Sequence, residues 1–589
     1  MTDAPADPRR AELVSRFLVL ALGGLFLLGL LGFIVAVLDA DDERAVLARP
    51  SLRGTSGSST EGSGPHIVLA VAPPGTQAGN GSSARTDRLA AASHPGTPAE
   101  AGLSAAAPAS TADAAAAADP SVIGPGMPVV PVVRFWSTQE GLARADIGRA
   151  LETGRLHGFA RIVVEDSVLE GLADALDVQV HPEVAHGDLD AVSRIIRRGG
   201  IGLVPATALT PSMRALRVDG RSLTGNERVA GVAAWPLLVA QPESLPAAWD
   251  QARTWVLVAG GDSFTDRGVY DTVVRGGKGV DYPFDGGTAR VTGHACCDPV
   301  FGDNVVPRYV LTGNRGVVRR LFREAELAIA NHEMPTTEAW AFHRSGLRFS
   351  GRPDLTRIFT RAGIDWLSLA NNHIKDYGTE GIRDTRRILR QHGIAFGGAG
   401  ADLAQARRIS YLEAGDTTLG IIACVGVAPF SWADPNSSGA TPCLDRYLVP
   451  DIKAATRRAD LVLVFPHWGV EYTRQPTPSM RRHAARWVKA GADLVIGGHS
   501  HVAGAIEDID GRPVLYSLGN LVFDQDWSTN TMESVMLEAT FHGDTLIELR
   551  LRPYIIHDTA QPNLLDPARG EGRRLLRQVR AASADWLDW

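Results

Sequence analysis

The stretch AGADLVIGGHSHVAG, residues 490–504, decides how the rest of the chain is interpreted. A run of small and apolar residues, Ala492, Leu494, Val495 and Ile496, stops at two glycines, and His499 and His501 follow with one residue between them. A single histidine after a strand usually lies at the surface or forms a hydrogen bond. A close pair at a glycine bend is a candidate pair of metal ligands, because neutral imidazole is the commonest protein ligand of metals and glycine lets the backbone turn closely. The pair predicts a metal site if other strands bring further ligands to it.

Length and charge set the first limits on the function. The chain has 589 residues, so two or more domains with linkers are expected. The formal net charge of −7 is small for this length, and we find no cluster of Lys and Arg that argues for nucleic-acid binding. We therefore expect no nucleic-acid partner.

The N-terminal region predicts a membrane anchor. Residues 17–38 contain no charged side chain and are long enough to cross a bilayer as a helix. Arginines precede this span and four acidic residues follow it closely, so residues 1–16 are expected to form a cytoplasmic tail, with the rest of the chain outside. A cleaved signal peptide is the alternative, but its apolar region should be shorter and VLDADD is a poor cleavage site. We expect a single-pass cell-membrane protein with an extracytoplasmic folded part.

The four cysteines would then lie in an oxidising compartment, where disulfides persist. Cys424 and Cys443 flank a loop rich in Pro, Ser and Gly and could pair with each other. Cys296 and Cys297 are adjacent, which strains a bridge between them. Four free thiols are the alternative that the sequence leaves open.

Composition divides the remaining chain into four segments. Residues 39–125 are dominated by Ala, Ser, Gly, Thr and Pro and cannot bury enough apolar surface to fold, so we expect a disordered stalk that holds the folded part away from the membrane. Residues 126–248 predict a small α/β domain whose pattern loosely resembles half of a substrate-binding-protein domain, with a structural or partner-docking role. Residues 249–559 alternate strand patterns with helix patterns that end at glycine, and residues 560–589 are expected to form a helical tail.

Nearly every apolar run in residues 249–559 ends on a polar or metal-binding residue type. These endings are Asp262, Asn331-His332-Glu333, Asn371-Asn372-His373, His467, the pair His499 and His501, and Asn520. Each alone is typical of a turn or a helix cap. Because alternating strands and helices place ligands beyond the carboxyl ends of the strands, we expect the six endings to meet at one edge of one sheet. Imidazole, carboxylate and amide groups without thiolate predict one or two divalent ions, Mn, Zn or Fe rather than Ca.

Six motifs in this order resemble those of a known family. They are GDSFTDRG, ANHEMPTT, SLANNHIKDYGTEGIRDT, HWGVEY, GADLVIGGHSHV and YSLGNLVFD. They are similar to the motifs of the CapA-type poly-γ-glutamate capsule proteins, which belong to the calcineurin-like metallophosphoesterase superfamily. The resemblance covers residues 255–555. It implies a layered α/β/β/α metallophosphoesterase-like domain with a metal-dependent, hydrolase-like site.

The resemblance also implies a role for each matching residue. The implied metal ligands are Asp262, Glu333 (which would bridge two ions), Asn372, His467, His499 and His501. His373 would not bind metal but would act as a general acid or as an electrostatic stabiliser. The ions would polarise the scissile group and lower the pKa of a bound water.

The chain departs from the superfamily pattern at two motifs. Phe264 stands where an Asp-x-His motif normally carries its histidine, so one ligand is missing. Asn331-His332-Glu333 replaces a Gly-Asp-x-x-Asp motif, and His332 either faces the site or packs in the core. These changes leave the metal count at one or two and count against ordinary phosphatase activity.

Further polar and aromatic residues near the motifs are weaker candidates. The candidate substrate-binding residues are Asn331, Asn371, Trp468, Glu471, Tyr472 and Asn520. For Trp468 and Tyr472 core packing is the alternative, and for Asn520 a turn. Asp376 is expected to cap the helix that follows His373. Glu471 and Arg267 either orient ligands or are plain surface charges.

Three functions fit this interpretation. We favour a membrane-anchored, metal-dependent hydrolase or transferase that acts on an extracellular polyanionic polymer such as poly-γ-glutamate. The second is a non-catalytic assembly or export factor that works with other capsule synthesis proteins, although a pure scaffold should have lost several ligands that this chain keeps. The third is a metal-dependent phosphoesterase, against which the missing Asp-x-His motif counts. A family resemblance specifies a site better than its chemistry.

Overall fold

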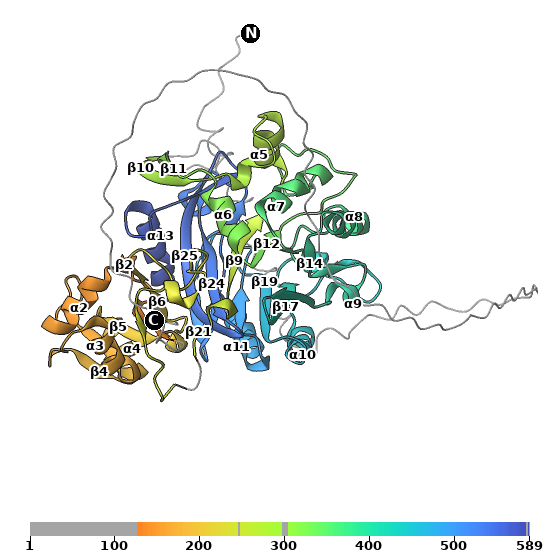
Figure 1. Cartoon of the computed structure of the whole chain (residues 1–589). Coiled ribbons are helices and arrows are strands. Elements are labelled where there is room, and N and C mark those ends of the chain that lie inside the picture. The colour runs from red at the N-terminus through yellow and green to blue at the C-terminus, as the bar shows by residue number, and fades with distance from the viewer. Residues whose placement is uncertain (1–125, 246–247, 297–303, 585–586, 588–589) are drawn as a thin grey trace, which may run out of the picture. The chain divides into compact units, whose positions relative to one another are not determined.

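The computed structural model describes residues 126–245, 248–296, 304–584 and 587 (Figure 1). The expected cytoplasmic tail, membrane helix and stalk, residues 1–125, lie outside these residues. A search of the described helices finds none that is both long and apolar enough to cross a bilayer. The folded part is a mixed α/β structure built on three main sheets.

Residues 127–239 form a six-stranded sheet with its own apolar core, in the order β4–β3–β5–β1–β6, with β8 also paired to β1. Its strands are β1 (Met127–Arg134), β3 (Ile162–Glu165), β4 (Ala185–Gly187), β5 (Ile201–Pro205), β6 (Met213–Ala215) and β8 (Leu238–Val239), beside a small pair of β2 (Gly141–Leu142) and β7 (Arg217–Val218). Its helices are α2 (Arg144–Thr153), α3 (Leu169–Leu176) and α4 (Leu189–Arg197). Gly154 ends α2 in the left-handed conformation, which is common at helix C-termini because glycine adopts it without strain.

The largest sheet runs in the order β11–β10–β26–β25–β24–β9–β12–β13–β14, with β23 also paired to β9. Its strands are β9 (Thr254–Ser263), β10 (Thr288–Cys296), β11 (Val305–Gly313), β12 (Leu327–His332), β13 (Trp366–Ser368), β14 (Ala395–Gly397), β23 (Asn520–Val522), β24 (Glu533–His542), β25 (Thr545–His557) and β26 (Gln561–Leu564). β9, β12, β13 and β14 are parallel, so their carboxyl ends share one edge. The expected tail 560–589 therefore contributes a strand, β26, as well as a helix.

A second large sheet has six strands in the order β16–β17–β19–β20–β22–β21. Its strands are β16 (Ser410–Ala414), β17 (Thr417–Val425), β19 (Leu461–His467), β20 (Leu494–Ile496), β21 (Ile506–Ile509) and β22 (Arg512–Leu515), and a separate short pair joins β15 (Ala399–Gly400) to β18 (Gly439–Ala440). β17, β19, β20 and β22 are parallel. The polar strand endings thus belong to two sheets, and the expectation of a single sheet was wrong.

The alternation of side chains along β19 shows how the layers pack. Leu461, Leu463 and Phe465 belong to the core that the two large sheets share, whereas Val462 and Val464 point to the opposite face. That opposite face is covered by α10 (Asp445–Ala455) and α11 (Pro478–Ala490), which lie beside this sheet in Figure 1. Period-two alternation of apolar residues on both faces is what a sheet buried between two layers requires.

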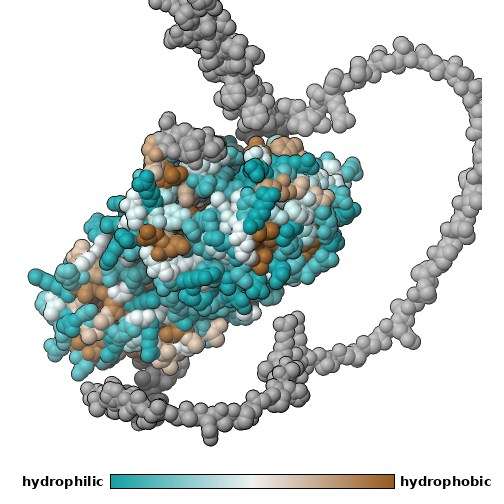
Figure 2. All heavy atoms as spheres, turned by 90° about the horizontal axis from the view of Figure 1, so that it is seen from above, coloured by the Kyte–Doolittle hydropathy of each residue, from teal (hydrophilic) through white to brown (hydrophobic). Residues whose placement is uncertain are grey.

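Helices cover the outer face of the largest sheet as well. They are α6 (Val317–Glu324), α7 (Arg357–Ala362) and α8 (Gly378–Gln391). Buried apolar residues of all three belong to the same continuous hydrophobic cluster as the strands of this sheet. Short helices α5 (Arg267–Tyr270), α9 (Leu403–Ala406) and α12 (Thr529–Met532) lie in connections, and α13 (Gly570–Ala582) contacts β10, β21 and β25. The face seen in Figure 2 is mostly hydrophilic with small separate apolar patches, as expected when the apolar residues lie between layers.

Buried charges join the 127–239 region to the largest sheet. Glu548 of β25 is fully buried, accepts a hydrogen bond from the backbone N–H of Ala215 at 2.9 Å, and pairs with Arg550 at 3.0 Å. Glu538 of β24 accepts a hydrogen bond from the backbone N–H of Asn226 at 2.9 Å. Such groups are costly to bury without partners, so these contacts fix how the two regions meet.

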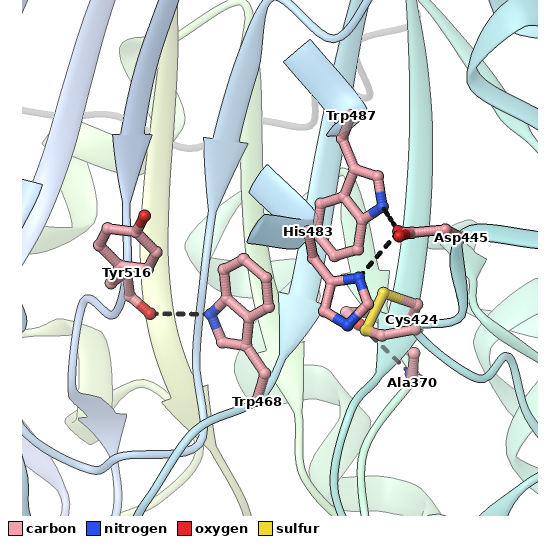
Figure 3. Close-up of a disulfide and its surroundings, with 9 residues drawn as sticks. Ala370, Cys424, Asp445, Trp468, His483, Trp487 and Tyr516 are labelled. Carbon is pink, nitrogen blue, oxygen red and sulfur yellow. Dashed lines mark hydrogen bonds and ion pairs between the residues drawn. A yellow bond between two sulfur atoms is a disulfide. The ribbon is translucent and has the colours of Figure 1, made fainter. Parts of the chain in front are cut away.

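Cys424 at the end of β17 and Cys443 form a disulfide (Figure 3). The predicted pairing is therefore confirmed. Cys296 is also disulfide-bonded, and the structure contains no free cysteine among its described residues. The alternative of four free thiols is therefore excluded for the described cysteines. Disulfides of this kind persist in oxidising compartments.

Candidate metal centre

The six predicted ligands meet where the carboxyl ends of both large sheets come together. Asp262 lies near the end of β9, and Glu333 follows β12 directly. His467 is the last residue of β19 in the second sheet, and the pair His499 and His501 follows β20. Parallel strands deliver their last side chains to the same edge, and here the edges of two packed sheets face one another.

Two groups of ligand atoms can each hold a metal ion, and both include Glu333. Ligand atoms of Glu333, His467 and His499 lie within 4.8 Å of one another, and so do ligand atoms of Asp262, Glu333 and His501. All five side chains are buried. Donor atoms at such spacing suit one ion in each group, with Glu333 placed to bridge the two positions.

In the first group, the second sheet supplies most of the donors. His467 Nε2 lies 2.8 Å from Asn372 Oδ1, 3.2 Å from His499 Nδ1 and 3.5 Å from Glu333 Oε1. Four donor atoms therefore converge on one small volume, and Asn372 joins this group as its amide donor. Two imidazoles, an amide and a carboxylate form a mixed nitrogen and oxygen set of the kind that Zn, Mn and Fe bind.

In the second group, carboxylates dominate. Asp262 Oδ2 lies 3.5 Å from His501 Nδ1, and His501 Nε2 lies 3.7 Å from Glu333 Oε1. The other Asp262 oxygen, Oδ1, lies 3.7 Å from His467 Nδ1. This position has one imidazole with two carboxylates, so it offers fewer donors than the first.

The charge state of the site fits a cation. Glu333 Oε1 is buried and accepts no hydrogen bond from any described residue. Burial raises the pKa of Glu333 to about 8, and burial together with the Glu333 charge raises the pKa of Asp262 to about 7. Burial also lowers the pKa of His467 to about 4 and that of His501 to about 3, which keeps these imidazoles neutral and able to bind metal. A divalent ion would satisfy the orphaned oxygen and stabilise both carboxylates.

The backbone around the two histidines differs from the glycine bend that the sequence suggested. The left-handed conformation is adopted by His499 (φ 88°) and His501 (φ 57°), and not by Gly497 or Gly498. The two glycines supply space instead: a Cβ on Gly498 would lie 2.6 Å from Asp262 Oδ1. A Cβ on Gly497 would lie 2.2 Å from the backbone oxygen of Tyr516. Glycine is therefore required here for close approach and not for its freedom in φ.

His373 lies beside the two groups without joining them. Its Nδ1 lies 3.0 Å from Asp376 Oδ2, and its ring packs 4.2 Å from the ring of Phe349. Asp376 also accepts a hydrogen bond from the backbone N–H of Phe349 at 2.8 Å. The predicted helix cap was wrong, because α8 begins at Gly378 with no side-chain cap. Asp376 holds the His373 ring instead; its position three residues after His373 was the available signal.

The family model for "Bacterial capsule synthesis protein PGA_cap" matches residues 256–525, which span every one of these side chains. The PGA biosynthesis protein CapA of Bacillus subtilis (strain 168) is 30% identical over 269 residues, which is 44% of this chain and 70% of that protein. This chain belongs to the PGA_cap family of capsule synthesis proteins. The resemblance inferred from the sequence motifs is thereby confirmed.

Two other comparisons cover a smaller share of the matched protein. The capsule biosynthesis protein CapA of Bacillus anthracis is 33% identical over 197 residues, covering 33% of this chain and 48% of that protein. The crystal structure of a 5'-nucleotidase precursor from Thermus thermophilus aligns with 56% of this chain and 58% of its own, at 13% identity and a TM-score of 0.30.

Phe264 makes the metal centre of this PGA_cap protein unlike a site with an Asp-x-His motif. Its ring is fully buried, stacks on Phe523 at 4.1 Å and meets Phe349 edge-on at 5.3 Å. Phe523 in turn lies 4.9 Å from the His501 ring. The position that would carry a ligand thus holds an aromatic group that supports His501 on one side and, through Phe349, His373 on the other.

Three asparagines predicted as substrate contacts form hydrogen bonds that orient other groups of the site. Asn331 Nδ2 donates to Asp262 Oδ1 at 2.8 Å, and Asn371 Nδ2 donates to Asn331 Oδ1 at 3.1 Å. Asn520 Oδ1 lies 2.9 Å from His501 Nδ1, so its amide oxygen accepts that N–H and leaves Nε2 of the imidazole for a metal. All three are buried, and their hydrogen bonds orient candidate ligands; their contact with substrate stays a prediction.

Two further candidates pack in the hydrophobic core. Trp468 is buried, stacks on Trp487 at 5.1 Å and donates to the backbone oxygen of Tyr516 at 3.1 Å, so it packs in the core (Figure 3). His332 also packs, with Nε2 2.8 Å from Thr336 Oγ1 and its ring against Phe359.

The open side of the centre is formed by exposed residues. Tyr472 is 46% exposed and its ring lies 6.2 Å from that of His501. Glu471 is exposed, and its charge contributes to raising the pKa of Glu333. Arg267 is paired with Asp524 at 2.5 Å and packs over the Phe349 ring, so it supports the His373 side of the centre. Phe349 and Phe523 carried no sequence signal, because aromatic residues between motifs are common in any core.

Proposed function

We propose that this PGA_cap protein is a divalent-metal-dependent hydrolase of an extracellular polyanionic polymer of the poly-γ-glutamate type. The observation that carries the proposal is the pair of buried donor groups that share Glu333, whose Oε1 atom lacks any hydrogen bond from a described residue. A protein that serves only as a scaffold has no need to keep five buried metal-binding side chains, which cost stability unless a cation pairs with them.

The residues have separable tasks in the proposed reaction. When bound, the metal supplies a polarised acceptor for the scissile group and a water of lowered pKa. Asp262, Glu333 and Asn372 would hold the ions together with the three ligand imidazoles. His373, whose Nδ1 is engaged by Asp376, has Nε2 left to give a proton to the leaving group. Water is added across one bond of the polymer, and no oxidant or further reactant is needed.

The polymer and the location belong to the same proposal. Relatives are named for capsule and PGA biosynthesis, which supports an anionic polymer as the substrate. The Cys424–Cys443 disulfide supports an oxidising compartment, so we place the folded part outside the cell membrane with residues 17–38 as its single anchor. Other capsule synthesis proteins are proposed as partners in polymer production.

Metal content tests the proposal directly. The full-length wild type should carry at least one equivalent of a transition metal, and the double variant His499→Ala/His501→Ala should carry almost none. His483→Ala is the matched control, because His483 pairs with Asp445 away from the centre. Elemental analysis of the three purified proteins gives the answer. Equal metal in wild type and double variant, or none in either, would rule out the metal centre.

His373→Ala separates catalysis from metal binding. Because His373 touches neither donor group as a ligand, this variant should keep the wild-type metal content and lose cleavage of poly-γ-glutamate, measured as the change in polymer chain length. Loss of the metal would show that His373 is a ligand. Unchanged cleavage would show that it has no part in the reaction, and no cleavage by wild type would favour the assembly role.

A further inference from the structure

A cavity of about 230 Å³ lies between the end of β1 and helix α13. Its wall includes four arginines, Arg134, Arg573, Arg577 and Arg580, together with Trp136. Among the described residues no Asp or Glu lines this cavity, and none of the four guanidinium groups forms an ion pair with one. We call these four arginines and Trp136 the arginine groove.

The register of α13 places three of these arginines on one face. Leu575, Val579 and Ala582 are buried on the inner side, so Arg573 and Arg577 and their neighbour Arg580 face outward. A charged outer face is usual for an amphipathic helix and is by itself only solvated. A helix rises 1.5 Å per residue, so the three side chains are spaced about 6 and about 4.5 Å apart along its axis.

Arg134 makes the groove more than the solvated face of one helix. It comes from β1, in the other region of the chain, and lies in the same cavity wall as Arg580. Burial, and after it the charge of Arg134, lowers the pKa of Arg580. Arg574, on the same helix, pairs instead with Glu571 at 2.5 Å and with Glu533. The chain therefore neutralises one arginine of α13 and gathers like charges at the others.

A second cavity borders the arginine groove. Its volume is about 560 Å³, and it shares Pro567 with the groove. Five arginines line it, Arg214, Arg290, Arg550, Arg552 and Arg569, against two acidic residues, Asp566 and Glu571. Arg290 and Arg569 are exposed. Three of the five are paired with glutamates, Arg214 with Glu140, Arg550 with Glu548 and Arg552 with Glu538, so among the described residues only Arg290 and Arg569 of this cavity lack an ion pair and can add to the charge of the groove.

The charge of the whole chain makes this local surface selective. A net charge of −7 repels polyanions from the protein in general, so a polyanion would be attracted only where positive charge is concentrated. Guanidinium groups bind carboxylates through paired hydrogen bonds, and an indole such as that of Trp136 packs against the aliphatic parts of a chain. An extended polymer with a carboxylate on every unit matches the repeated spacing of the arginines.

Helix α13 also contacts the loop that carries the metal-binding histidines. Arg474 donates to Gln578 Oε1 of α13 at 3.1 Å and to the backbone oxygen of Ala503, two residues after His501, at 2.6 Å. At the end of the helix, Ser583 Oγ accepts a hydrogen bond from the backbone N–H of Ile506 at 2.8 Å. In Figure 1, α13 lies beside β25. Helix α13, which carries three of the groove arginines, is therefore hydrogen-bonded through Arg474 to the loop that follows His501.

We propose that the arginine groove binds the carboxylate polymer along α13 and holds it for the metal centre. The proposal rests on the proposed function for the identity of the polymer. It adds a binding surface outside the metal centre, formed by both regions of the chain.

Binding of fluorescently labelled poly-γ-glutamate to the full-length protein tests the groove. The triple variant Arg573→Gln/Arg577→Gln/Arg580→Gln should bind about tenfold more weakly than wild type, as expected for the loss of three exposed ion pairs. Arg155→Gln/Arg161→Gln/Arg198→Gln is the charge-matched control, because these exposed arginines lie away from the cavities. The control should bind as wild type does, and wild-type affinity should fall as salt is raised.

Three results of the polymer assay would refute the groove, and vesicle binding and metal content are two further measurements. Equal affinity of the groove variant and wild type, an equal loss in the control, or no polymer binding by wild type would each overturn the groove. Vesicles with anionic lipid are the second probe, and groove-dependent binding to vesicles but not to the polymer would reject the polymer as ligand. Metal content of the groove variant should equal that of wild type, so failure of the metal centre, seen in His499→Ala/His501→Ala, is distinguishable from failure of the groove.

Discussion

Substituting Gly498 by alanine should weaken metal binding without any change to a ligand. An added Cβ would lie 2.6 Å from Asp262 Oδ1 and 3.4 Å from His467 Nδ1, both in the metal centre. Gly498 does not adopt the left-handed conformation, so alanine causes no strain in its φ angle. The whole effect of Gly498→Ala therefore arises from contact with the ligands.

The structure sets the size of this effect. A contact under 3 Å forces the Asp262 carboxylate to move by several tenths of an ångström, and inserting a methyl group into a packed site costs about 1–3 kcal/mol of stability. Disturbing the groups that hold a metal ligand in position lowers metal affinity by roughly 10–100-fold. Since each factor of ten corresponds to about 1.4 kcal/mol, the expected loss of metal-binding free energy is roughly 1.4–2.8 kcal/mol.

Metal affinity of the full-length chain, measured by competition with a chromogenic chelator, gives the result. Gly231→Ala is the control, because a Cβ at Gly231 meets nothing within 4 Å. Gly497→Ala provides a second comparison: its Cβ would meet the backbone oxygen of Tyr516 at 2.2 Å, so it should lower the unfolding temperature of the metal-free protein more than Gly498→Ala does. Wild-type metal affinity in Gly498→Ala would refute the assignment of Asp262 as a ligand.

Two other substitutions test the site and the junction between the regions. Phe264→His places an imidazole two residues after Asp262, where an Asp-x-His motif carries its histidine, and should raise the metal-to-protein ratio found by elemental analysis. An unchanged ratio would show that this position does not face the ions. Burial opposes the charged form of Glu538, but Arg552 and Arg550 outweigh it and lower its pKa to about 2. The charged form of Glu538 therefore stabilises the folded protein by at most about 3 kcal/mol above about pH 4.5, and this stabilisation is lost as the pH falls toward 2. Glu538→Gln should destabilise the protein at pH 7 and approach wild type near pH 2 in urea unfolding, and a pH-independent difference would contradict this origin.

The ligand set could be predicted because its chemistry is local in sequence. Each ligand follows an apolar strand, and a parallel strand delivers its last residue to a known edge. What the strand pattern could not reveal is that the edges belong to two sheets, because strand order depends on long-range pairing. β19 and β9 carry the same kind of pattern, yet they lie in different sheets of one sandwich.

The error at Asp376 and the missing signal at residues 573–580 have a different cause. A carboxylate just before a helix is most often a cap, and only the packing of Phe349 beside His373 turns Asp376 toward the imidazole. Residues 573–580 have the sequence RRLLRQVR, which by itself is typical of the solvated face of a helix. Arginines on one helix have meaning only once Arg134, more than 400 positions away, is found in the same cavity wall.

The backbone at the two histidines is the strongest sign that the site is functional. A left-handed conformation costs a residue other than glycine about 1–3 kcal/mol and persists only where its surroundings enforce it. Here the backbone N–H of His499 donates to Asp262 Oδ2 at 2.9 Å, and Asn520 holds the His501 ring. Glycine at positions 499 and 501 would relieve the strain but would remove both imidazoles. The protein keeps glycine at 497 and 498, where a Cβ would collide with a ligand or with Tyr516, and keeps histidine where the backbone is strained. The requirement for two imidazoles at this centre therefore outweighs the preference of histidine for a negative φ angle.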